Sequence, residues 1–326
     1  MKKYFLPCCF TLLLSTLQAQ KTIGSIEILD AALSKVIPAE AKIEVLAEGF
    51  QWAEGPVWVP ELEAVLFTDV PKNVAYKWDE THGLTPYLDP SGYTAIAPNE
   101  KKSGGNGLLL DAAGGLLIAQ HGDRRIARIA PPLKTPAAFE TVVGKYQGKF
   151  FNSPNDLVLS KAGDLYFTDP PYGLKGDDDP LKEIDENGVY RLSKNGDLTM
   201  LYSSLSRPNG LAFSPDESVL YVANSDPKQN LWMAFAMEEG KIIRENVFFD
   251  ASGYKRRGLA DGLKVHSSGY VFATGPGGVL IFSLEGKHLG TILTEVRTAN
   301  CAFDAQEEYL YMTSTQYLLR IKIKEQ

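Results

Sequence analysis

Cysteine and histidine are both scarce in this chain of 326 residues, which holds three cysteines and four histidines. Cys8 and Cys9 lie in an apolar run near the N-terminus, so only Cys301 is left for the rest of the protein. One cysteine forms no internal disulfide, which excludes the class of small exported domains held together by disulfides. The fold must instead depend on the packing of its core and on its topology.

Clusters of positive charge are also missing. The formal net charge is -7, so we expect no nucleic-acid partner, and we expect the pairs Arg124-Arg125 and Arg256-Arg257 to be solvated. The chain has no Gly-x-Ser-x-Gly turn of a serine hydrolase and no His-Glu-x-x-His motif of a zinc protease. No helical pattern follows the glycines of residues 104–107, which argues against a phosphate-binding loop.

Residues 1–20 have the pattern of a secretory signal peptide. Lys2 and Lys3 precede an apolar run over residues 4–14, and Ala19 offers a small residue for cleavage. The run is too short to span a membrane, and no later stretch is long and apolar enough to do so. We therefore expect an exported protein, periplasmic or secreted, with no membrane insertion after cleavage and with residues 21–326 as a single domain.

A repeat runs through the rest of the chain. Six times a polar residue comes before a short apolar strand, a turn and a second strand, at spacings of 52, 49, 54, 52 and 39 residues. A repeat of about 40 to 50 residues built from strands is typical of a β-propeller. The sequence predicts an all-β fold, a six-bladed β-propeller with four-stranded blades. The lead residues of the repeats are Glu54, Asn106, Asn155, Asn209, Asp261 and Asn300.

The last repeat is too short to complete a blade by itself. Only 26 residues follow Asn300, which is enough for three strands. Residues 41–47, just before the first repeat, have an alternating apolar pattern and are the expected fourth strand. Pairing the first and last segments would close the ring and remove two open sheet edges. Trimming residues 40–48 should then unfold it.

Equivalent positions in six blades lie at the same distance from the ring axis, so the lead residues should point at a common centre. Their side chains offer only carboxylate and carboxamide oxygens, and such a set favours Ca²⁺ over zinc or copper. The other interpretation is that these residues only cap the inner strands through hydrogen bonds to the backbone, as Asn and Asp often do.

The motifs around four lead residues resemble those of the family that joins senescence marker protein, gluconolactonase and luciferin-regenerating enzyme. The similarity covers about residues 45–320, and residues 106–111, 120–125 and 167–173 are most similar to the bacterial gluconolactonase branch. The resemblance implies a six-bladed propeller with one divalent cation, usually calcium, in the central channel. It implies the metal ligands Glu54, Asn155, Asn209 and Asp261.

The chemistry expected of such a site is the opening of a sugar lactone, glucono-1,5-lactone or a related aldonolactone, with the cation polarising the carbonyl. Asp261 is the expected general base, and His121 is a second candidate for proton transfer. The expected substrate contacts are Asn106, Asn155, His121 and Tyr172. We expect His266 and His288 at the surface.

Two other functions stay open at this point. The diisopropyl fluorophosphatase group has a similar metal site on a similar ring, so a phosphotriesterase or another ester hydrolase fits the same ligands. A non-enzymatic binding module also fits, because propellers serve many functions. The sequence leaves the identity of the lactone and the oligomeric state undecided.

Overall fold

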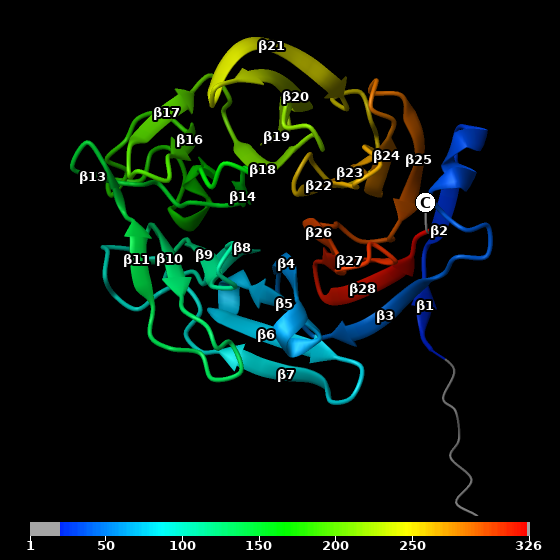
Figure 1. Ribbon diagram of the computed structural model, residues 1–326, viewed down its shortest axis with the longest axis horizontal. Coiled ribbons are helices and arrows are strands. Elements are labelled where there is room, and N and C mark those ends of the chain that lie inside the picture. Colours follow the sequence, from blue (N-terminus) through cyan, green and yellow to red (C-terminus); the bar gives the residue numbers. More distant parts are fainter. Residues whose placement is uncertain (1–19, 325–326) are drawn as a thin grey trace, which may run out of the picture.

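Six small antiparallel sheets stand in a ring around a common axis in the computed structural model (Figure 1), which describes residues 20–324. The predicted signal peptide lies outside the described residues, except for its last residue, Gln20. The predicted six-bladed propeller is confirmed. In every blade the chain runs outward from the innermost strand through at least two successive antiparallel strands, and in two blades strands from the N-terminal part are added at the outer edge.

Each of the first three blades consists of four consecutive strands. Blade 1 contains β4 (Ala53–Val59), β5 (Ala64–Asp69), β6 (Val74–Asp79) and β7 (Gly83–Leu88). Blade 2 contains β8 (Gly105–Leu110), β9 (Leu116–Gln120), β10 (Arg125–Ile129) and β11 (Glu140–Val143). Blade 3 contains β14 (Leu157–Leu159), β15 (Leu165–Asp169), β16 (Gly188–Leu192) and β17 (Leu198–Tyr202). A small hairpin of β12 (Lys145–Tyr146) and β13 (Lys149–Phe150) lies in the sequence between blades 2 and 3.

Blade 4 again has four consecutive strands, whereas blades 5 and 6 also include strands from the N-terminal part of the chain. Blade 4 contains β18 (Pro208–Phe213), β19 (Val219–Asp226), β20 (Gln229–Glu238) and β21 (Lys241–Asp250). Blade 5 contains β22 (Leu263–Val265), β23 (Val271–Gly275), β24 (Gly278–Phe282), β25 (His288–Leu293) and, from the N-terminal part, β2 (Ser25–Ile28). Blade 6 contains β26 (Asn300–Phe303), β27 (Tyr309–Ser314), β28 (Tyr317–Lys322), β3 (Ile43–Glu48) and β1 (Thr22–Ile23).

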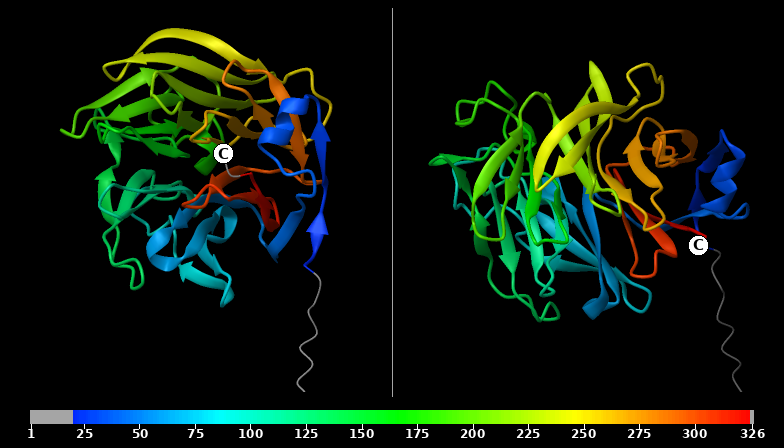
Figure 2. Two further views of the ribbon diagram at one scale, coloured as in Figure 1. Left: turned by 45° about the vertical axis from the view of Figure 1, so that its right-hand side comes forward. Right: turned by 45° about the horizontal axis from the view of Figure 1, so that its top comes forward.

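The ring closes as the sequence predicts. Strand β3 pairs antiparallel with β28, with Val45 opposite Leu319. The four-stranded prediction is incomplete for two blades, because β2 adds a fifth strand to blade 5 and β1 adds one to blade 6. In the turned views of Figure 2 this N-terminal part lies on the outer side of the ring, where it covers the edges of both blades.

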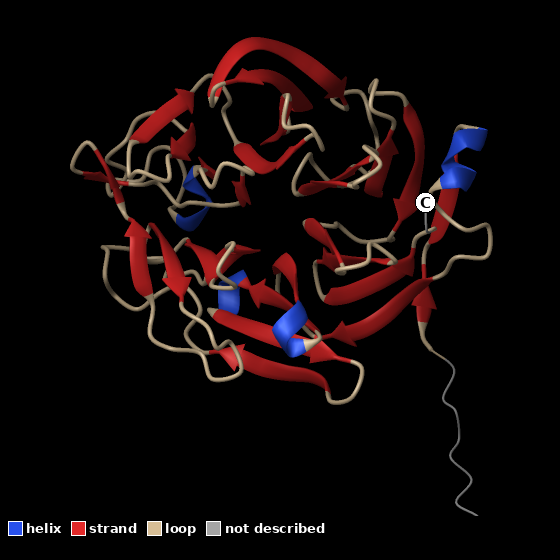
Figure 3. Cartoon of the chain, in the orientation of Figure 1, coloured by secondary structure: helices blue, strands red, loops and turns tan. Residues whose placement is uncertain are grey.

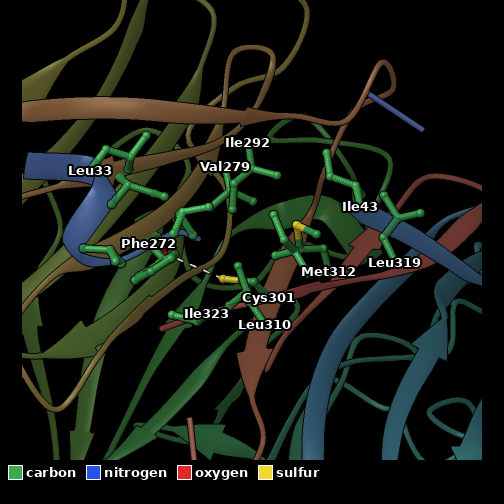
Figure 4. Packing of buried hydrophobic residues seen from close by; sticks show 14 of the residues in the cluster. Leu33, Ile43, Phe272, Val279, Ile292, Cys301, Leu310, Met312, Leu319 and Ile323 are labelled. Carbon is green, nitrogen blue, oxygen red and sulfur yellow. Dashed lines mark hydrogen bonds between the residues drawn. The ribbon is translucent and has the colours of Figure 1, made fainter. Parts of the chain in front are cut away.

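Packing of the N-terminal part against blades 5 and 6 forms one large apolar cluster (Figure 4). Leu33, from the short 3-10 helix η1 (Ala31–Lys35), and Ile43 from β3 meet Leu310 and Leu319 of blade 6 there. The single cysteine, Cys301, is buried in the same cluster, with its Sγ 3.7 Å from the carbonyl oxygen of Phe272. The seam of the ring, where β3 meets β28, is thus held by an apolar core and by strand pairing.

Helices contribute little to the fold (Figure 3). Besides η1 there are three single turns of 3-10 helix in loops, η2 (Pro60–Leu62), η3 (Val70–Lys72) and η4 (Pro171–Gly173). Within residues 20–324 no helix has the length and apolarity needed to cross a membrane.

Two predictions of surface positions are wrong, one for an arginine pair and one for two histidines. Arg124 and Arg125 are buried rather than solvated: Arg124 Nε donates to the carbonyl of Phe151 at 2.6 Å, and Arg125 Nε donates to the Gln120 side chain at 2.6 Å. Oxygen acceptors replace part of the water that these groups lose on burial, although Nη1 of Arg124 has no hydrogen-bond partner among the described residues.

His266 is also buried, and His288 is half-buried rather than at the surface. His266 contacts the edge of the Phe303 ring, and its Nε2 lies 3.3 Å from a carboxylate oxygen of Glu307.

Candidate functional site

The innermost strands bring the lead residues to the ring axis. Three of them lie within inner strands: Glu54 in β4, Asn106 in β8 and Asn209 in β18. Two others, Asn155 and Asp261, each lie two residues before an inner strand, β14 and β22 respectively. A cavity of about 630 Å³ opens at this place. All seven predicted site residues line it: Glu54, Asn106, His121, Asn155, Tyr172, Asn209 and Asp261.

A glycine after most lead residues lets neighbouring blades approach closely. Gly55 has φ +48, and a Cβ at this position would lie 2.0 Å from the carbonyl oxygen of Asn106 in the next blade. A Cβ on Gly262 would lie 2.1 Å from Cγ of Asn300. Only glycine leaves room for this contact, so the repeated polar-Gly pair fixes the lead residues of adjacent blades against one another.

Threonines on the second strands hold the backbone of the lead residues from the neighbouring blade. Thr68 Oγ1 donates to the carbonyl of Asn106 at 3.0 Å, and Thr168 Oγ1 donates to the carbonyl of Asn209 at 2.7 Å. The sequence analysis missed these positioning residues. The signal was present as the repeated Phe-Thr-Asp of residues 67–69 and 167–169.

Glu54 is almost fully buried, with 3% of its surface exposed. Its carboxylate accepts from the backbone N–H of Gly55 at 3.0 Å and lies 3.4 Å from Nε1 of Trp52. Burial, and then the negative charge of Asp156, raise the pKa of Glu54 to about 7. A carboxyl in this condition binds a proton readily or, in its place, a cation.

Asp261 is the second carboxylate at the cavity. Its Oδ1 is buried and has no hydrogen-bond partner among the described residues. Burial, followed by the charges of Glu54 and Asp156, raises the pKa of Asp261 well above its usual range, while a hydrogen bond with the Asn209 side chain acts in the opposite direction. An acceptor oxygen buried without a partner is costly unless a ligand satisfies it.

Asp156 is a third carboxylate near the axis, and the sequence analysis missed it. Its Oδ2 accepts from the Asn300 side chain at 3.1 Å and lies 3.8 Å from Nζ of Lys264. The Asn300 side chain also acts to lower the pKa of Glu54, so it influences two of the buried carboxylates and does more than mark the closing blade. Asp156 directly follows Asn155 where the other repeats have glycine or Cys301, and this difference was the available signal.

His121, in the turn directly after β9, is 2% exposed. Its Nε2 lies 3.5 Å from the side-chain nitrogen of Asn155. Burial, and then the positive charge of Lys101, lower the pKa of His121 to about 3. The imidazole is therefore neutral at neutral pH, with a ring nitrogen that can accept a hydrogen bond.

Asn106 and Tyr172 supply further polar groups to the cavity. The Oδ1 of Asn106 is buried without a hydrogen-bond partner in the described part of the chain. Tyr172 Oη donates to the carbonyl of Ser225 at 3.2 Å, and burial raises the pKa of Tyr172 to about 12, which keeps the hydroxyl neutral. Both side chains suit recognition of sugar hydroxyls, which donate and accept hydrogen bonds.

The predicted ligand set fits a hard cation. Among residues 20–324 no three His, Cys, Asp or Glu side chains form a group that could hold a metal ion by themselves, so carboxamide oxygens would have to complete the shell. The cavity supplies them from Asn155 and Asn209, next to the carboxylates of Glu54 and Asp261. The pKa values of both carboxyls are raised and Asp261 Oδ1 has no partner among the described residues, so a bound cation would stabilise the ionised carboxylates.

Comparison with known proteins identifies the family of the chain. The family model described as the SMP-30/gluconolactonase/LRE-like region matches residues 52–316. The chain belongs to this family. The resemblance stated from the sequence is therefore confirmed, and the match covers the ring from just before β4 to just before β28.

Relatives within and around the SMP-30/gluconolactonase/LRE-like family have similar lengths. A gluconolactonase of Zymomonas mobilis is 38% identical over 313 residues, which is 93% of this chain and 87% of that protein. The solved structure of a gluconolactonase from Xanthomonas campestris has a TM-score of 0.81 at 29% identity, over 94% of this chain and 99% of that one. A calcium-binding regucalcin from Agrobacterium tumefaciens, at 19% identity, 86% and 94% coverage and a TM-score of 0.66, shows the fold alone.

Proposed function

We propose that this protein is a calcium-dependent lactonase that hydrolyses sugar lactones, with glucono-1,5-lactone or a related aldonolactone as substrate. The observation that carries the proposal is the convergence of Glu54, Asn155, Asn209 and Asp261 from four blades on one cavity. The gluconolactonases among its relatives support the reaction class.

The proposed roles follow from the positions of the side chains. Glu54, Asn155, Asn209 and Asp261 would hold the cation, which when bound supplies a Lewis acid that draws electron density from the lactone carbonyl. Asn106, His121 and Tyr172 would bind the hydroxyls of the sugar, and Asn155 would also lie against the substrate. Holding the ring in one orientation places the carbonyl carbon for attack by water.

In the reaction, an oxygen of water bonds to the carbonyl carbon, the bond from that carbon to the ring oxygen breaks, and the ring oxygen takes up a proton. We assign the proton of water to Asp261, whose Oδ1 is buried at the cavity without a hydrogen-bond partner among the described residues. A pKa lowered to about 3 makes His121 a poor base. His121 is then a hydrogen-bond acceptor for substrate.

The test is a panel of lactones and phosphotriesters assayed with calcium and with a chelator. We expect lactone hydrolysis that is lost on chelation and restored by Ca²⁺. Asp261→Asn should lower kcat by at least about a hundredfold, whereas Glu238→Gln, an exposed carboxylate on β20, should not. Turnover of phosphotriesters alone would favour the second hydrolase class, and calcium binding without any turnover would indicate a binding module.

We also propose that the protein is exported. The support is the pattern of residues 1–20, with Lys2 and Lys3 before an apolar run. Fractionation of cells expressing the full chain, followed by N-terminal sequencing, is the test. Recovery of the uncleaved chain in the cytoplasm would overturn this proposal.

A further inference from the structure

Two cationic side chains line the cavity, and neither is paired with an acid. Lys101 lies in the loop between β7 and β8, and Arg297 lies in the loop between β25 and β26. The ion pairs recorded within residues 20–324 include neither of them. Nearby lysines differ in this respect, since Lys72 pairs with Asp69 and Lys175 pairs with Glu100.

Lys101 is held in place although no carboxylate holds it. Its Nζ donates to the carbonyl oxygen of Tyr172 at 2.6 Å, which fixes the ammonium beside a residue of the cavity wall. Burial lowers the pKa of Lys101, and its charge is close enough to lower the pKa of His121. One carbonyl uses one of the three ammonium donors, so two remain for a ligand.

Arg297 comes from a different part of the ring. The loop that carries Lys101 connects blades 1 and 2, and the loop that carries Arg297 connects blades 5 and 6, so the two loops are two blades apart around the ring (Figure 1). Arg297 is exposed, its carbonyl accepts from Thr315 Oγ1 at 3.0 Å, and the next residue, Thr298, is buried and also lines the cavity. The backbone of this residue is therefore fixed, while its guanidinium is available at the mouth.

Negative and positive side chains of the cavity thus lie at different depths. The carboxylates lie on the buried inner strands, where the cation would balance them, and both positive side chains lie in loops nearer to solvent. With the carboxylates balanced, the remaining charge of the cavity is positive. Such a wall attracts an anionic group and disfavours an additional cation.

Resting on the proposed lactonase function, we infer that the substrates of this site are lactones with a negatively charged substituent away from the lactone carbonyl, and that Lys101 and Arg297 are the residues that select them. A sugar acid lactone with a second carboxylate, or a phosphorylated sugar lactone, has this chemistry. Either group would receive charge-assisted hydrogen bonds from the two cations.

The test compares lactones that differ only in charge. D-glucaro-1,4-lactone differs from D-glucono-1,4-lactone by a carboxylate at C6, and 6-phospho-D-glucono-1,5-lactone differs from D-glucono-1,5-lactone by a phosphate. For each pair the measured quantity is the ratio of kcat/KM for the charged lactone to that for the neutral lactone, with Ca²⁺ present. We expect a ratio above one for at least one pair, and a ratio that falls as ionic strength rises.

Variants then assign the selection to residues. Lys101→Gln and Arg297→Gln should each lower the ratio about tenfold, and Lys101→Arg should restore part of it. Lys102→Gln is the matched control, because Lys102 is the adjacent, exposed lysine and does not line the cavity. The ratio is measured within one protein, so a variant with a smaller folded fraction does not distort it.

Each outcome decides something. Hydrolysis of the neutral lactones with ratios at or below one, or ratios that the two variants leave unchanged, would overturn this inference and keep the proposed function. If the variants change only inhibition by the aldonate formed from the neutral lactone, the cations bind the product carboxylate and the inference about substrate is wrong. If no lactone is hydrolysed, the proposed function fails and this inference fails with it.

Discussion

The buried carboxylate of Glu54 should destabilise the protein when no cation is bound. Burial and the charge of Asp156 raise the pKa of Glu54 from 4.5 to about 7. One pKa unit corresponds to about 1.36 kcal/mol, so keeping this group ionised in the folded, cation-free state costs about 3 kcal/mol. Glu54→Gln removes the charge and keeps the shape, including an oxygen that can accept from Gly55.

The sign of the effect depends on pH. The folded protein holds the Glu54 proton more tightly than the unfolded chain does, so the carboxyl is neutral in both states below about pH 4 and costs nothing there. The penalty grows between pH 4.5 and about 7, and it is complete above pH 7. In a chelator at pH 8, Glu54→Gln should therefore raise the free energy of unfolding by about 2–3 kcal/mol, with little effect at pH 4.

Equilibrium urea denaturation at both pH values measures this difference. Adding Ca²⁺ at pH 8 should reverse the order, because the wild-type protein gains more from the cation than a variant that has lost a ligand. Glu238→Gln, at an exposed position, serves as the control and should change little. A Glu54→Gln protein that is no more stable than wild type in chelator at pH 8 would refute the reasoning.

Three further predictions concern the ring seam, a surface ion pair and cation binding. Leu319→Ala, at a fully buried position of β28, should destabilise the fold by about 2–5 kcal/mol in urea denaturation. Lys322→Ala, at an exposed position of the same strand, is the control and should change little. Equal effects would contradict tight packing where β28 meets β3. Asp79 lies 2.8 Å from Lys77 Nζ, and this contact lowers the pKa of Asp79. Its stabilisation is present above the usual aspartate pKa and is lost progressively as the pH falls below about 4, so Asp79→Asn should cost up to about 1 kcal/mol at pH 7 and steadily less on acidification. A cost independent of pH would oppose this assignment. Because Ca²⁺ must displace the Glu54 proton below pH 7, its affinity in calorimetry should fall at least about tenfold per pH unit from pH 7 to pH 5, and a flat profile would argue against Glu54 as a ligand.

The repeat made most of the fold predictable. A polar residue at the same register of each repeat is a signal that local sequence can carry, and it identified five of the residues that line the cavity, Glu54, Asn106, Asn155, Asn209 and Asp261. His121 and Tyr172 also line the cavity but lie outside this pattern. Closure was also predictable, because the last repeat lacked a strand and the segment that forms β3 had an alternating apolar pattern. Strands β1 and β2 were not predictable in this way, since two to four residues are too few for a periodic pattern.

The remaining errors involve partners that are distant in the sequence. Arg124 is buried because it donates to the carbonyl of Phe151, a contact that no property of the turn after β9 reveals. Lys101 belongs to a loop rich in polar residues, and only the folded ring places its ammonium against Tyr172, 71 residues later. The role of such a side chain depends on a neighbouring blade, so it can be recognised only in the folded structure.

The seam between β3 and β28 also has a consequence for how the ring forms. Arg320 of β28 donates to Glu44 of β3, and these residues are 276 positions apart. During synthesis from the N-terminus, β3 is made early and waits for one of the last strands of the chain. Until then the edge of β3 lacks its partner and the apolar cluster around Ile43 lacks the side chains of β28, so the nearly complete chain is exposed to aggregation. A chaperone that shields this part of the chain until synthesis ends would protect the yield of the folded ring more than one that acts on any single blade.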